Sequence, residues 1–133
     1  TKQEILKELD NFLIVEEKEF CGCGRIVTYS EVCEICSICI KEEYQKKGYG
    51  SKLLKKLIKA SNKKYIAVHT SLKNRKFFEK NGFKYLDTAP KVYLSDKTPD
   101  YIREMVGDCV QCDKFPNHCP EIIMVYEKAF RQG

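Results

Sequence analysis

Apolar and polar positions recur along the chain with two periods, one typical of helices and one typical of strands. In residues 2–10, Ile5, Leu6 and Leu9 are spaced as on one face of a helix, so this segment predicts a short amphipathic helix. The three segments that follow are rich in aromatic and β-branched residues and predict strands. These strands are expected at 12–17, 20–29 and 33–40. The last of the three is apolar on both faces, which is typical of a strand in the middle of a sheet.

The middle of the chain carries the clearest helical pattern. Four apolar residues within 53–58 form a stripe opposite a row of lysines, which predicts an amphipathic helix after the glycine-containing segment 45–50. Beyond it, the pattern predicts a strand at 65–70, a helix ended by the Asn-Gly pair at 81–82, and a strand at 83–87.

All four prolines and three of the eight cysteines fall in residues 88–120. This segment is therefore predicted to be an irregular excursion, followed by a last strand at 121–128. The alternation of strands and helices before it predicts a mixed α/β sheet. A length of 133 residues suits one domain, so we expect a single domain over 1–133 with a Cys/Pro-rich insertion at about 88–120.

Composition narrows the class of protein further. With 43% hydrophobic and 32% charged residues the chain is typical of a globular protein. It holds no stretch of about 18 apolar residues, and its N-terminus lacks the apolar core of a signal peptide. We therefore expect a soluble, cytoplasmic protein with no membrane partner, in which cysteines serve as thiols or metal ligands by default.

Positive charge is concentrated in one segment. Residues 41–64 hold nine lysines and two glutamates, a local charge of +7 against +5 for the whole chain. Such a run is typical of a solvated face, and it also suits a polyanionic ligand, either nucleotide phosphates or nucleic acid. Because the lysines alternate with an apolar stripe and no nucleic-acid docking motif is present, nucleic-acid binding is the disfavoured interpretation.

The start of the predicted helix has the features of an anion site. In the segment QKKGYG, Gly48 and Gly50 bring bare backbone amides to the first turn, where unpaired N–H groups and the helix dipole attract anions. A plain turn and helix cap is the alternative. Neither the dinucleotide-binding glycine fingerprint nor a Walker A motif is present, which removes the two commonest nucleotide-binding patterns.

In its wider context this loop resembles that of the GNAT superfamily of acetyl-CoA-dependent N-acetyltransferases. The family signature is Q/R-x-x-G-x-G/A between a central strand and a long helix, and residues 45–50 match it. Upstream, EICSICIKEEYQKKGYGSKLL is similar to the family's strand-loop-helix block, and downstream NRKFFEKNGFKYL is similar to its helix-GF-strand block. The resemblance covers roughly residues 3–95 and the final strand.

The resemblance implies a fold and a reaction. The fold is a mixed, mostly antiparallel central sheet flanked by helices, and the family's first strand and helix are expected to be missing here. The reaction is transfer of the acetyl group of acetyl-CoA, as cosubstrate, to a primary amine. The segment EILKELDNFLIVEE and the GCG strand after it also resemble the acetyltransferase domain of bacterial N-acetylglutamate synthase, which favours a small amino-acid-like acceptor.

By the same resemblance the cofactor's pantetheine arm pairs with the main chain of the third predicted strand, and its pyrophosphate lies on the amides that open the helix. Ordinary core packing is the alternative role for the strand residues. The implied cofactor-binding residues are Ile38, Cys39, Ile40, Gln45, Lys46, Lys47, Gly48, Tyr49, Gly50, Ser51 and Phe78.

The candidate catalytic residue is Glu34. It falls at the strand position that carries the general base in GNAT histone acetyltransferases, where it would take the amine's proton directly or through a water. An exposed charge at the strand's end is the alternative, and Glu31 is a nearby substitute. Phe78 occupies the place of a tyrosine that acts as general acid in many members, and a phenyl ring donates no proton. We therefore expect Phe78 only to pack against the cofactor, while water or another side chain protonates the thiolate.

Three further groups have open interpretations. Candidates for binding an acceptor's carboxylate are the cations Arg25, Lys73, Arg75 and Lys91, each of which also suits a solvated surface. Near the C-terminus the pattern C-x2-C-x5-H-C predicts a structural zinc site, free thiols or a disulfide, with Cys109, Cys112 and Cys119 as candidate metal ligands. His69 ends a predicted strand and is interpreted as a satisfied histidine rather than a catalyst.

Two function classes besides the enzyme stay open. A non-catalytic CoA-binding sensor or regulatory domain would keep the phosphate loop without the chemistry, and the absent tyrosine favours it. A nucleic-acid-binding module rests on the basic segment together with Tyr44 and Tyr49. Since many GNAT proteins form dimers, the resemblance also allows a homodimer.

Overall fold

The chain forms two compact units in a computed structural model, each built around its own strands. The backbone is described for residues 2–7, 12–17, 19–40, 48–106 and 111–129, and the side chains for 26–36, 48–106 and 111–129. The first unit comprises residues 1–27 and 35–62, and the second comprises 28–34 and 63–133.

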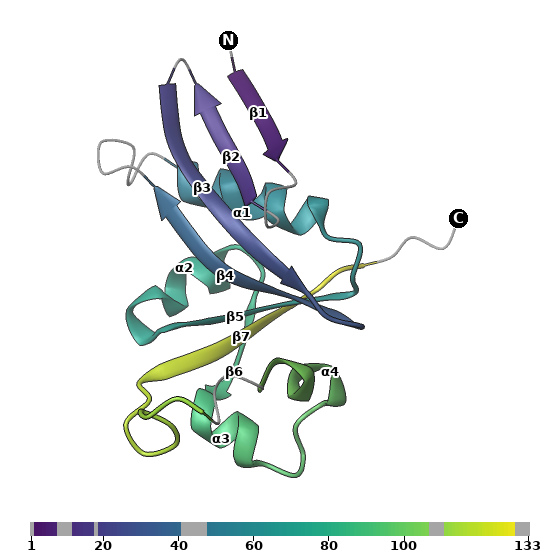
Figure 1. The fold of residues 1–133 in the computed structure, drawn as a ribbon, viewed down its shortest axis with the longest axis vertical. Helices are drawn as coiled ribbons and strands as arrows, with labels where there is room; N and C mark the ends of the chain where they lie inside the picture. The colour runs from purple at the N-terminus through teal and green to yellow at the C-terminus, as the bar shows by residue number, and fades with distance from the viewer. Residues whose placement is uncertain (1, 8–11, 18, 41–47, 107–110, 130–133) are drawn as a thin grey trace. The chain divides into compact units, whose positions relative to one another are not determined.

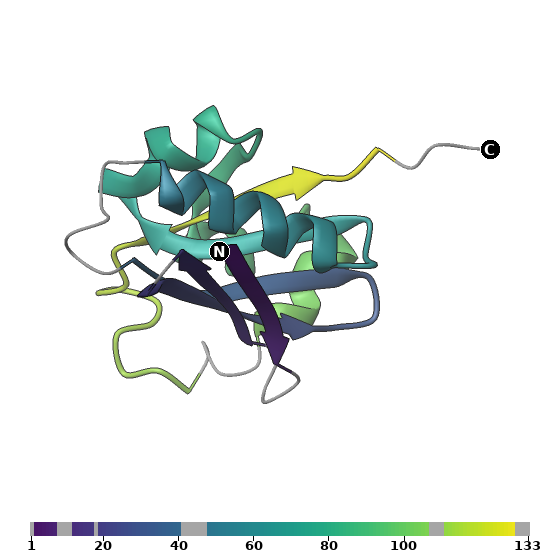
Figure 2. The ribbon, with the colours of Figure 1, turned by 90° about the horizontal axis from the view of Figure 1, so that it is seen from above.

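The first unit is an antiparallel sheet with one helix. Its strands lie in the order β1-β2-β3-β4, and the β1–β2 and β2–β3 pairs are antiparallel (Figure 1). The helix α1 packs against β2 (Figure 2). The bounds of these elements are β1 Lys2–Lys7, β2 Phe12–Glu17, β3 Glu19–Thr28, β4 Val32–Ile40 and α1 Tyr49–Ala60. The strands predicted at 12–17, 20–29 and 33–40 are thus confirmed.

The helix predicted at 2–10 is wrong, because Lys2–Lys7 is a strand. Its register places Ile5 opposite Ile14 and Leu6 opposite Leu13. An isolated helix of about nine residues is marginal in water, since nucleation fixes several dihedral angles for few hydrogen bonds. Pairing with an adjacent strand satisfies the same backbone groups at once, and here it overrides the helical spacing of the apolar residues.

Helix α1 follows directly from its apolar stripe. Leu53, Leu54, Leu57 and Ile58 are all buried, as the sequence predicts. At its C-terminal end the N–H of the buried Ser61 donates to the carbonyls of Leu57 and Ile58, which closes the last turn. Within the described ranges, neither α1 nor any other helix has the length and apolar character needed to cross a membrane.

The second unit holds a second antiparallel group of strands, β5 Tyr65–Ser71, β6 Lys84–Thr88 and β7 Glu121–Glu127. Their order is β5-β7-β6, so the chain's last strand inserts between two earlier ones. The link from β5 to β6 is a 3-10 turn at Leu72–Asn74 and helix α2, Arg75–Lys80. The strands predicted at 65–70, 83–87 and 121–128 and the intervening helix are confirmed.

Residues 89–94 and 100–106 are helical, so the prediction of an irregular excursion over 88–120 is wrong for these parts. They form α3 (Ala89–Leu94), α4 (Asp100–Arg103) and a 3-10 turn at Glu104–Val106. Pro90 lies in the first turn of α3, where a proline's missing N–H and fixed φ are tolerated. Proline therefore marks the beginning of a helix here rather than the absence of one.

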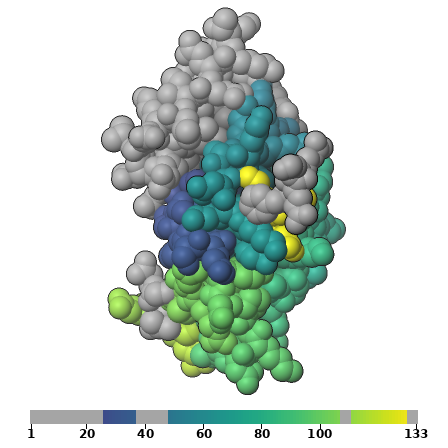
Figure 3. All heavy atoms as spheres, turned by 90° about the vertical axis from the view of Figure 1, so that its right-hand side faces the viewer, coloured from purple at the N-terminus to yellow at the C-terminus, as the bar shows by residue number. Residues whose placement is uncertain are grey.

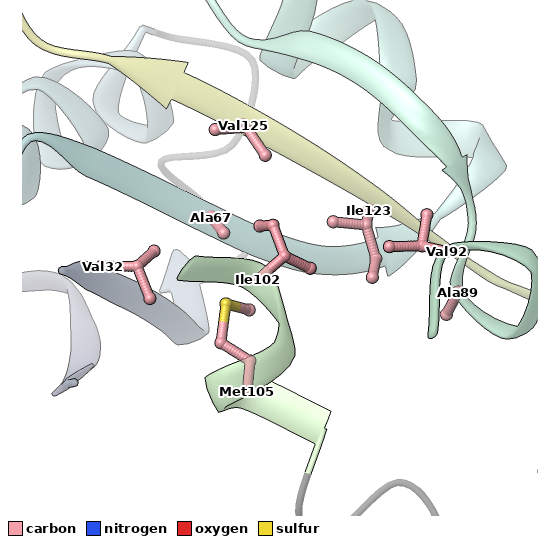
Figure 4. Packing of buried hydrophobic residues seen from close by; sticks show 8 residues of the cluster. All are labelled: Val32, Ala67, Ala89, Val92, Ile102, Met105, Ile123 and Val125. Atoms are coloured by element: carbon pink, nitrogen blue, oxygen red, sulfur yellow. The ribbon is translucent and has the colours of Figure 1, made fainter. Parts of the chain in front are cut away.

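The core of the second unit joins these short helices to the strands. Its cluster of buried side chains comes from the start of β4, from β5, β7, α3, α4 and the 3-10 turn (Figure 4). The members are Val32, Ala67, Ala89, Val92, Ile102, Met105, Ile123 and Val125. On the surface of the same unit the segment at 28–34 lies against α4 and the 3-10 turn (Figure 3), where the Ser30 hydroxyl and N–H donate to the Glu104 carboxylate.

Candidate functional site

A chain of four hydrogen-bonded side chains crosses the second unit. Glu34, near the start of β4, accepts from His69 on β5, with 2.9 Å between Oε2 and Nδ1. The other ring nitrogen, Nε2, lies 2.6 Å from the hydroxyl of Tyr93 on α3. At the far side of the carboxylate, the hydroxyl of Tyr29 donates to Glu34 Oε1 over 3.2 Å. Three elements and the turn before β4 thus converge on one carboxylate and one imidazole.

The tautomer of His69 decides which group donates in each of these contacts. When the Glu34 carboxylate is ionised it can only accept, and Nδ1 of His69 then carries the hydrogen that it receives. In the neutral ring Nε2 is then the acceptor, and the Tyr93 hydroxyl donates to it. The order carboxylate, imidazole and hydroxyl is the one in which a hydroxyl's proton is withdrawn in hydrolytic triads.

Burial makes this arrangement effective. The side chains of Glu34 and His69 are only 16% and 12% exposed. With little water around them, a charge on either group is screened less than it would be on the surface. The alternative prediction for Glu34, an exposed charge at the end of a strand, is therefore wrong. Glu31, its suggested substitute, is exposed.

Local structure explains how Tyr29 and Glu34 meet. The Tyr29 N–H donates to the Val32 carbonyl over 2.8 Å and closes a tight turn between β3 and β4. His69 is a satisfied histidine, as expected, because its two ring nitrogens contact the side chains of Glu34 and Tyr93. The sequence does not identify Tyr29 and Tyr93 as members of the site. Tyr29 lies 5 residues from Glu34 and Tyr93 lies 24 residues from His69, and no local motif links either pair.

The predicted anion site falls partly within the described residues. Gly48 precedes α1 with φ of +84°, in the left-handed region, and the first turn of α1 holds no acidic side chain. Space is not what selects glycine there, since a Cβ atom added to Gly48 would meet nothing within 4 Å, so the backbone angle is the requirement. Tyr49, Gly50 and Ser51 form the first turn of α1. The remaining loop predictions, Gln45, Lys46 and Lys47, lie outside the described residues.

The other predicted cofactor-binding positions lie on β4 and α2. Ile38, Cys39 and Ile40 are the last residues of β4, which gives them the extended backbone that strand-like pairing requires. Phe78 on α2 is buried, with its ring centroid 5.1 Å from that of Phe77 and 5.2 Å from that of Phe83. It packs as an apolar ring, in keeping with a side chain that has no ionisable group and so cannot donate a proton.

The cysteine cluster gains no support as a metal site. Among the described residues, no group of three or more His, Cys, Asp or Glu side chains is placed to hold a metal ion. Cys112 is an exposed free thiol and Cys119 a half-buried one, while Cys109 lies outside the described residues. Zinc binding by these cysteines stays a prediction.

The candidate carboxylate-binding cations have separate surroundings. Arg75 lies over the Tyr85 ring at 3.9 Å and pairs with Glu79, so its guanidinium is already engaged. Lys73 is exposed, and Lys91 lines a cavity of the second unit that includes none of the four side chains described above. The side chain of Arg25 lies outside the described set.

The family model and the relative that match this chain are both acetyltransferases. The model of the acetyltransferase (GNAT) domain family matches residues 8–85, more than half of the chain. An uncharacterized N-acetyltransferase from Chlorobaculum tepidum is 28% identical over 126 residues, which cover 92% of this chain and 74% of the relative.

Solved structures share the fold. N-acetylglutamate synthase from Neisseria gonorrhoeae, solved with coenzyme A and N-acetyl-glutamate, is similar with a TM-score of 0.65 and 20% identity over 90% of this chain. The match spans only 26% of that enzyme's chain. A GNAT family acetyltransferase from Elizabethkingia anophelis, solved with acetyl-CoA bound, has a TM-score of 0.63 and 23% identity, covering 88% of this chain and 75% of its own. The mixed, mostly antiparallel α/β fold is thus confirmed.

Proposed function

This chain belongs to the GNAT family of acetyltransferases, and from that premise we propose that it transfers the acetyl group of acetyl-CoA to the primary amine of a small, amino-acid-like molecule. The observation that carries the proposal is the largely buried Glu34–His69 pair. Attack on a thioester needs a neutral amine, so the acceptor's ammonium group must lose a proton at the site. We assign the general base to this pair.

Acetyl-CoA is the proposed cosubstrate. The first turn of α1 behind Gly48 offers backbone N–H groups and the positive end of a helix dipole to the pyrophosphate. The extended backbone at Ile38 and Ile40 suits strand-like pairing with the pantetheine arm. The Elizabethkingia structure was solved with acetyl-CoA and the Neisseria structure with coenzyme A, which supports the same ligand here.

An amino-acid-like acceptor is the finer part of the proposal. Its support is the structural likeness to a synthase whose structure holds N-acetyl-glutamate, the acetylated form of an α-amino acid. Because the match spans about a quarter of that enzyme, glutamate is the first acceptor to test rather than an assignment.

Binding and turnover are tested separately. Acetyl-CoA should raise the thermal unfolding midpoint in a concentration-dependent way, because a ligand of the native state stabilises it by mass action. Turnover is then followed by mass spectrometry of the amine rather than by a thiol reagent, since the chain has eight cysteines of its own.

The matched variant is Glu34→Gln, which keeps the side chain's size and removes its charge. We expect it to keep the acetyl-CoA-dependent midpoint rise and to lose about 10²-fold or more in kcat, the usual contribution of a general base. A midpoint rise without acetylation of any amine by the unmodified protein would contradict the proposal. That result would identify a CoA-binding sensor, the function that the absence of a tyrosine at Phe78 favours.

A further inference from the structure

We propose that a cavity lined by β6, α3 and the segment after α3 binds an acidic α-amino acid such as glutamate or aspartate. The cavity lies in the second unit and has a volume of about 240 Å³. Its lining includes none of the four side chains Tyr29, Glu34, His69 and Tyr93, so it is separate from the hydrogen-bonded chain described above. Binding at this cavity therefore goes beyond acetyl transfer and does not depend on it.

The size of the cavity limits the ligand. A molecule of liquid water takes up about 30 Å³, so the cavity has room for the equivalent of about eight waters. Clefts that bind drug-sized ligands measure about 300–1,000 Å³. A free amino acid therefore suits the cavity, whereas a nucleotide or a coenzyme does not.

The charged side chains of the lining are two cations and one anion. Lys91 on α3 and Lys97 in the segment after it carry the ammonium groups, and Asp87 on β6 carries the carboxylate. At neutral pH an acidic amino acid carries the opposite set, two carboxylates and one ammonium group. The lining is therefore complementary in charge to glutamate or aspartate, and such complementarity favours these ligands over neutral or basic amino acids.

The three charged groups remain available to a ligand. Both lysine side chains are exposed, and neither forms an ion pair with a residue that the structure describes. Asp87 is half-buried, and within the same residues only its Oδ1 has a partner, the N–H of Thr88 at 2.7 Å. Oδ2 is thus left to accept from the ligand's ammonium group.

The apolar part of the lining suits the ligand's carbon chain. Val92 on α3 is buried, and Leu86 on β6 packs against the core of the second unit. Pro99 adds a third apolar side chain to the lining. The short methylene chain that separates the two carboxylates of glutamate can lie against these side chains.

Hydrogen bonds hold the segment between α3 and α4 in place (Figure 1). The Ser95 N–H donates to the Lys91 carbonyl over 3.1 Å, and the hydroxyl of the buried Thr98 donates to the Val92 carbonyl. From α4, the Arg103 guanidinium donates to the carbonyls of Ser95 and Thr98 over 3.0 and 3.3 Å. This wall of the cavity is formed without a ligand, so little ordering is needed on binding, which favours affinity.

The geometry of α3 separates the cavity from the Glu34–His69 pair. Successive residues of an α-helix are rotated by about 100°, so the side chains of Lys91 and Tyr93 leave α3 about 200° apart. Tyr93 contacts His69, whereas Lys91 lines the cavity. The two sites therefore lie on opposite sides of α3.

Backbone NMR signals test the site directly. Glutamate is titrated, without acetyl-CoA, into ¹⁵N-labelled protein, and we expect saturable shifts of the amide signals of Ser95, Lys97 and Thr98. Glutarate lacks the ammonium group, and glutamine lacks one carboxylate. Each should bind about fivefold more weakly than glutamate, since each loses one partly exposed ion pair.

Variants assign the binding to the charged lining. The double variant of Lys91→Gln and Lys97→Gln should weaken glutamate binding by about tenfold or more. Lys84→Gln is the matched control, because Lys84 is an exposed lysine of β6 outside the lining, and its loss should weaken binding by less than about twofold. Asp87→Asn keeps the oxygen that accepts from Thr88 and should abolish the preference for glutamate over glutarate. Thermal scans check that each variant is folded.

Three results would overturn the site. They are the absence of shifts in these signals at tens of millimolar glutamate, equal affinities for glutamate and glutarate in the unmodified protein, and equal losses in Lys84→Gln and the double variant. Since the titration contains no acetyl-CoA, its result is independent of turnover. Saturable shifts in a protein that acetylates no amine would contradict the proposed acetyl transfer and leave this site standing.

Discussion

At the scale of single residues, two glycines with similar positive φ angles differ in the atoms that a side chain at their position would meet. Gly48 and Gly82 have φ of +84° and +93°, where a side chain costs about 1–2 kcal/mol. A Cβ at Gly48 meets nothing within 4 Å, whereas at Gly82 it would lie 2.9 Å from Cε2 of Tyr126. A side chain at Gly48 would therefore cost backbone conformational energy alone, whereas a side chain at Gly82 would also clash with the Tyr126 ring.

We therefore expect Gly48→Ala to lower the free energy of unfolding by about 1–2 kcal/mol, and Gly82→Ala to lower it by more. Urea denaturation of the two variants beside the unmodified protein measures both effects. Equal losses would show that the Tyr126 ring moves aside without cost.

Residues of the site that are far from their partners along the chain could not be predicted from the sequence. Glu34 is the candidate base because the resemblance to the GNAT family places the general base at its position in the strand. Its partners could not be identified in that way. Tyr93 lies 24 residues from His69, in a segment whose composition indicated a loop, and only the packing of α3 brings the two together.

At the scale of elements, the short helices of residues 89–106 depend on the core rather than on helical propensity. Helix α4 has only four residues, too few to be stable alone, and its Ile102 is fully buried. We expect Ile102→Ala to lower the free energy of unfolding by about 2–5 kcal/mol, through lost burial and the cavity left behind.

Leu94 provides the control, because it ends α3 and is 67% exposed. Leu94→Ala should change the unfolding free energy by no more than about 0.5 kcal/mol. Similar losses for the two variants, measured by urea denaturation, would contradict the placement of Ile102 in the core.

The contact between the turn at Ser30 and the 3-10 turn at Glu104 should depend on pH. Hydrogen bonds from the Ser30 hydroxyl hold the pKa of Glu104 below its usual value. A lowered carboxyl pKa stabilises the folded state above the unfolded-state pKa, and this stabilisation is lost as the pH falls through the folded-state pKa.

We expect Glu104→Gln to lower the thermal midpoint at pH 7 by a small amount, because the carboxylate is exposed. The difference from the unmodified protein should shrink as the pH falls from about 5 to 3. Midpoints from thermal scans at matched ionic strength measure it. A difference that grows toward low pH would mean that Glu104 is not stabilised in its charged form.

Periodicity identified the elements whose burial follows from their own residues, such as α1 with its leucine stripe and β5 with its apolar run. It did not identify elements whose burial or strand pairing depends on residues elsewhere in the chain. The residues of β1 have helical spacing but pair with β2, and α3 and α4 become helical because their few apolar residues are buried with β5 and β7.

At the scale of the whole molecule, the sequence alone led to the acetyltransferase fold because three motif segments occur in the family's order. The family match and the shared folds confirm that inference. The acceptor could not be predicted in the same way. Its recognition depends on a few charged side chains whose surroundings are fixed only in the folded protein, as the engagement of Arg75 with Tyr85 and Glu79 illustrates.

The most direct test of acetyl transfer is to incubate the protein with ¹³C-acetyl-CoA and a mixture of the common amino acids, and to weigh the amines by mass spectrometry. We expect one or a few of them, glutamate foremost, to gain the labelled acetyl group in proportion to protein concentration, and Glu34→Gln to abolish nearly all of that gain. Unlabelled amines beside a protein that is still stabilised by acetyl-CoA would contradict the enzyme and leave a CoA-binding domain in its place.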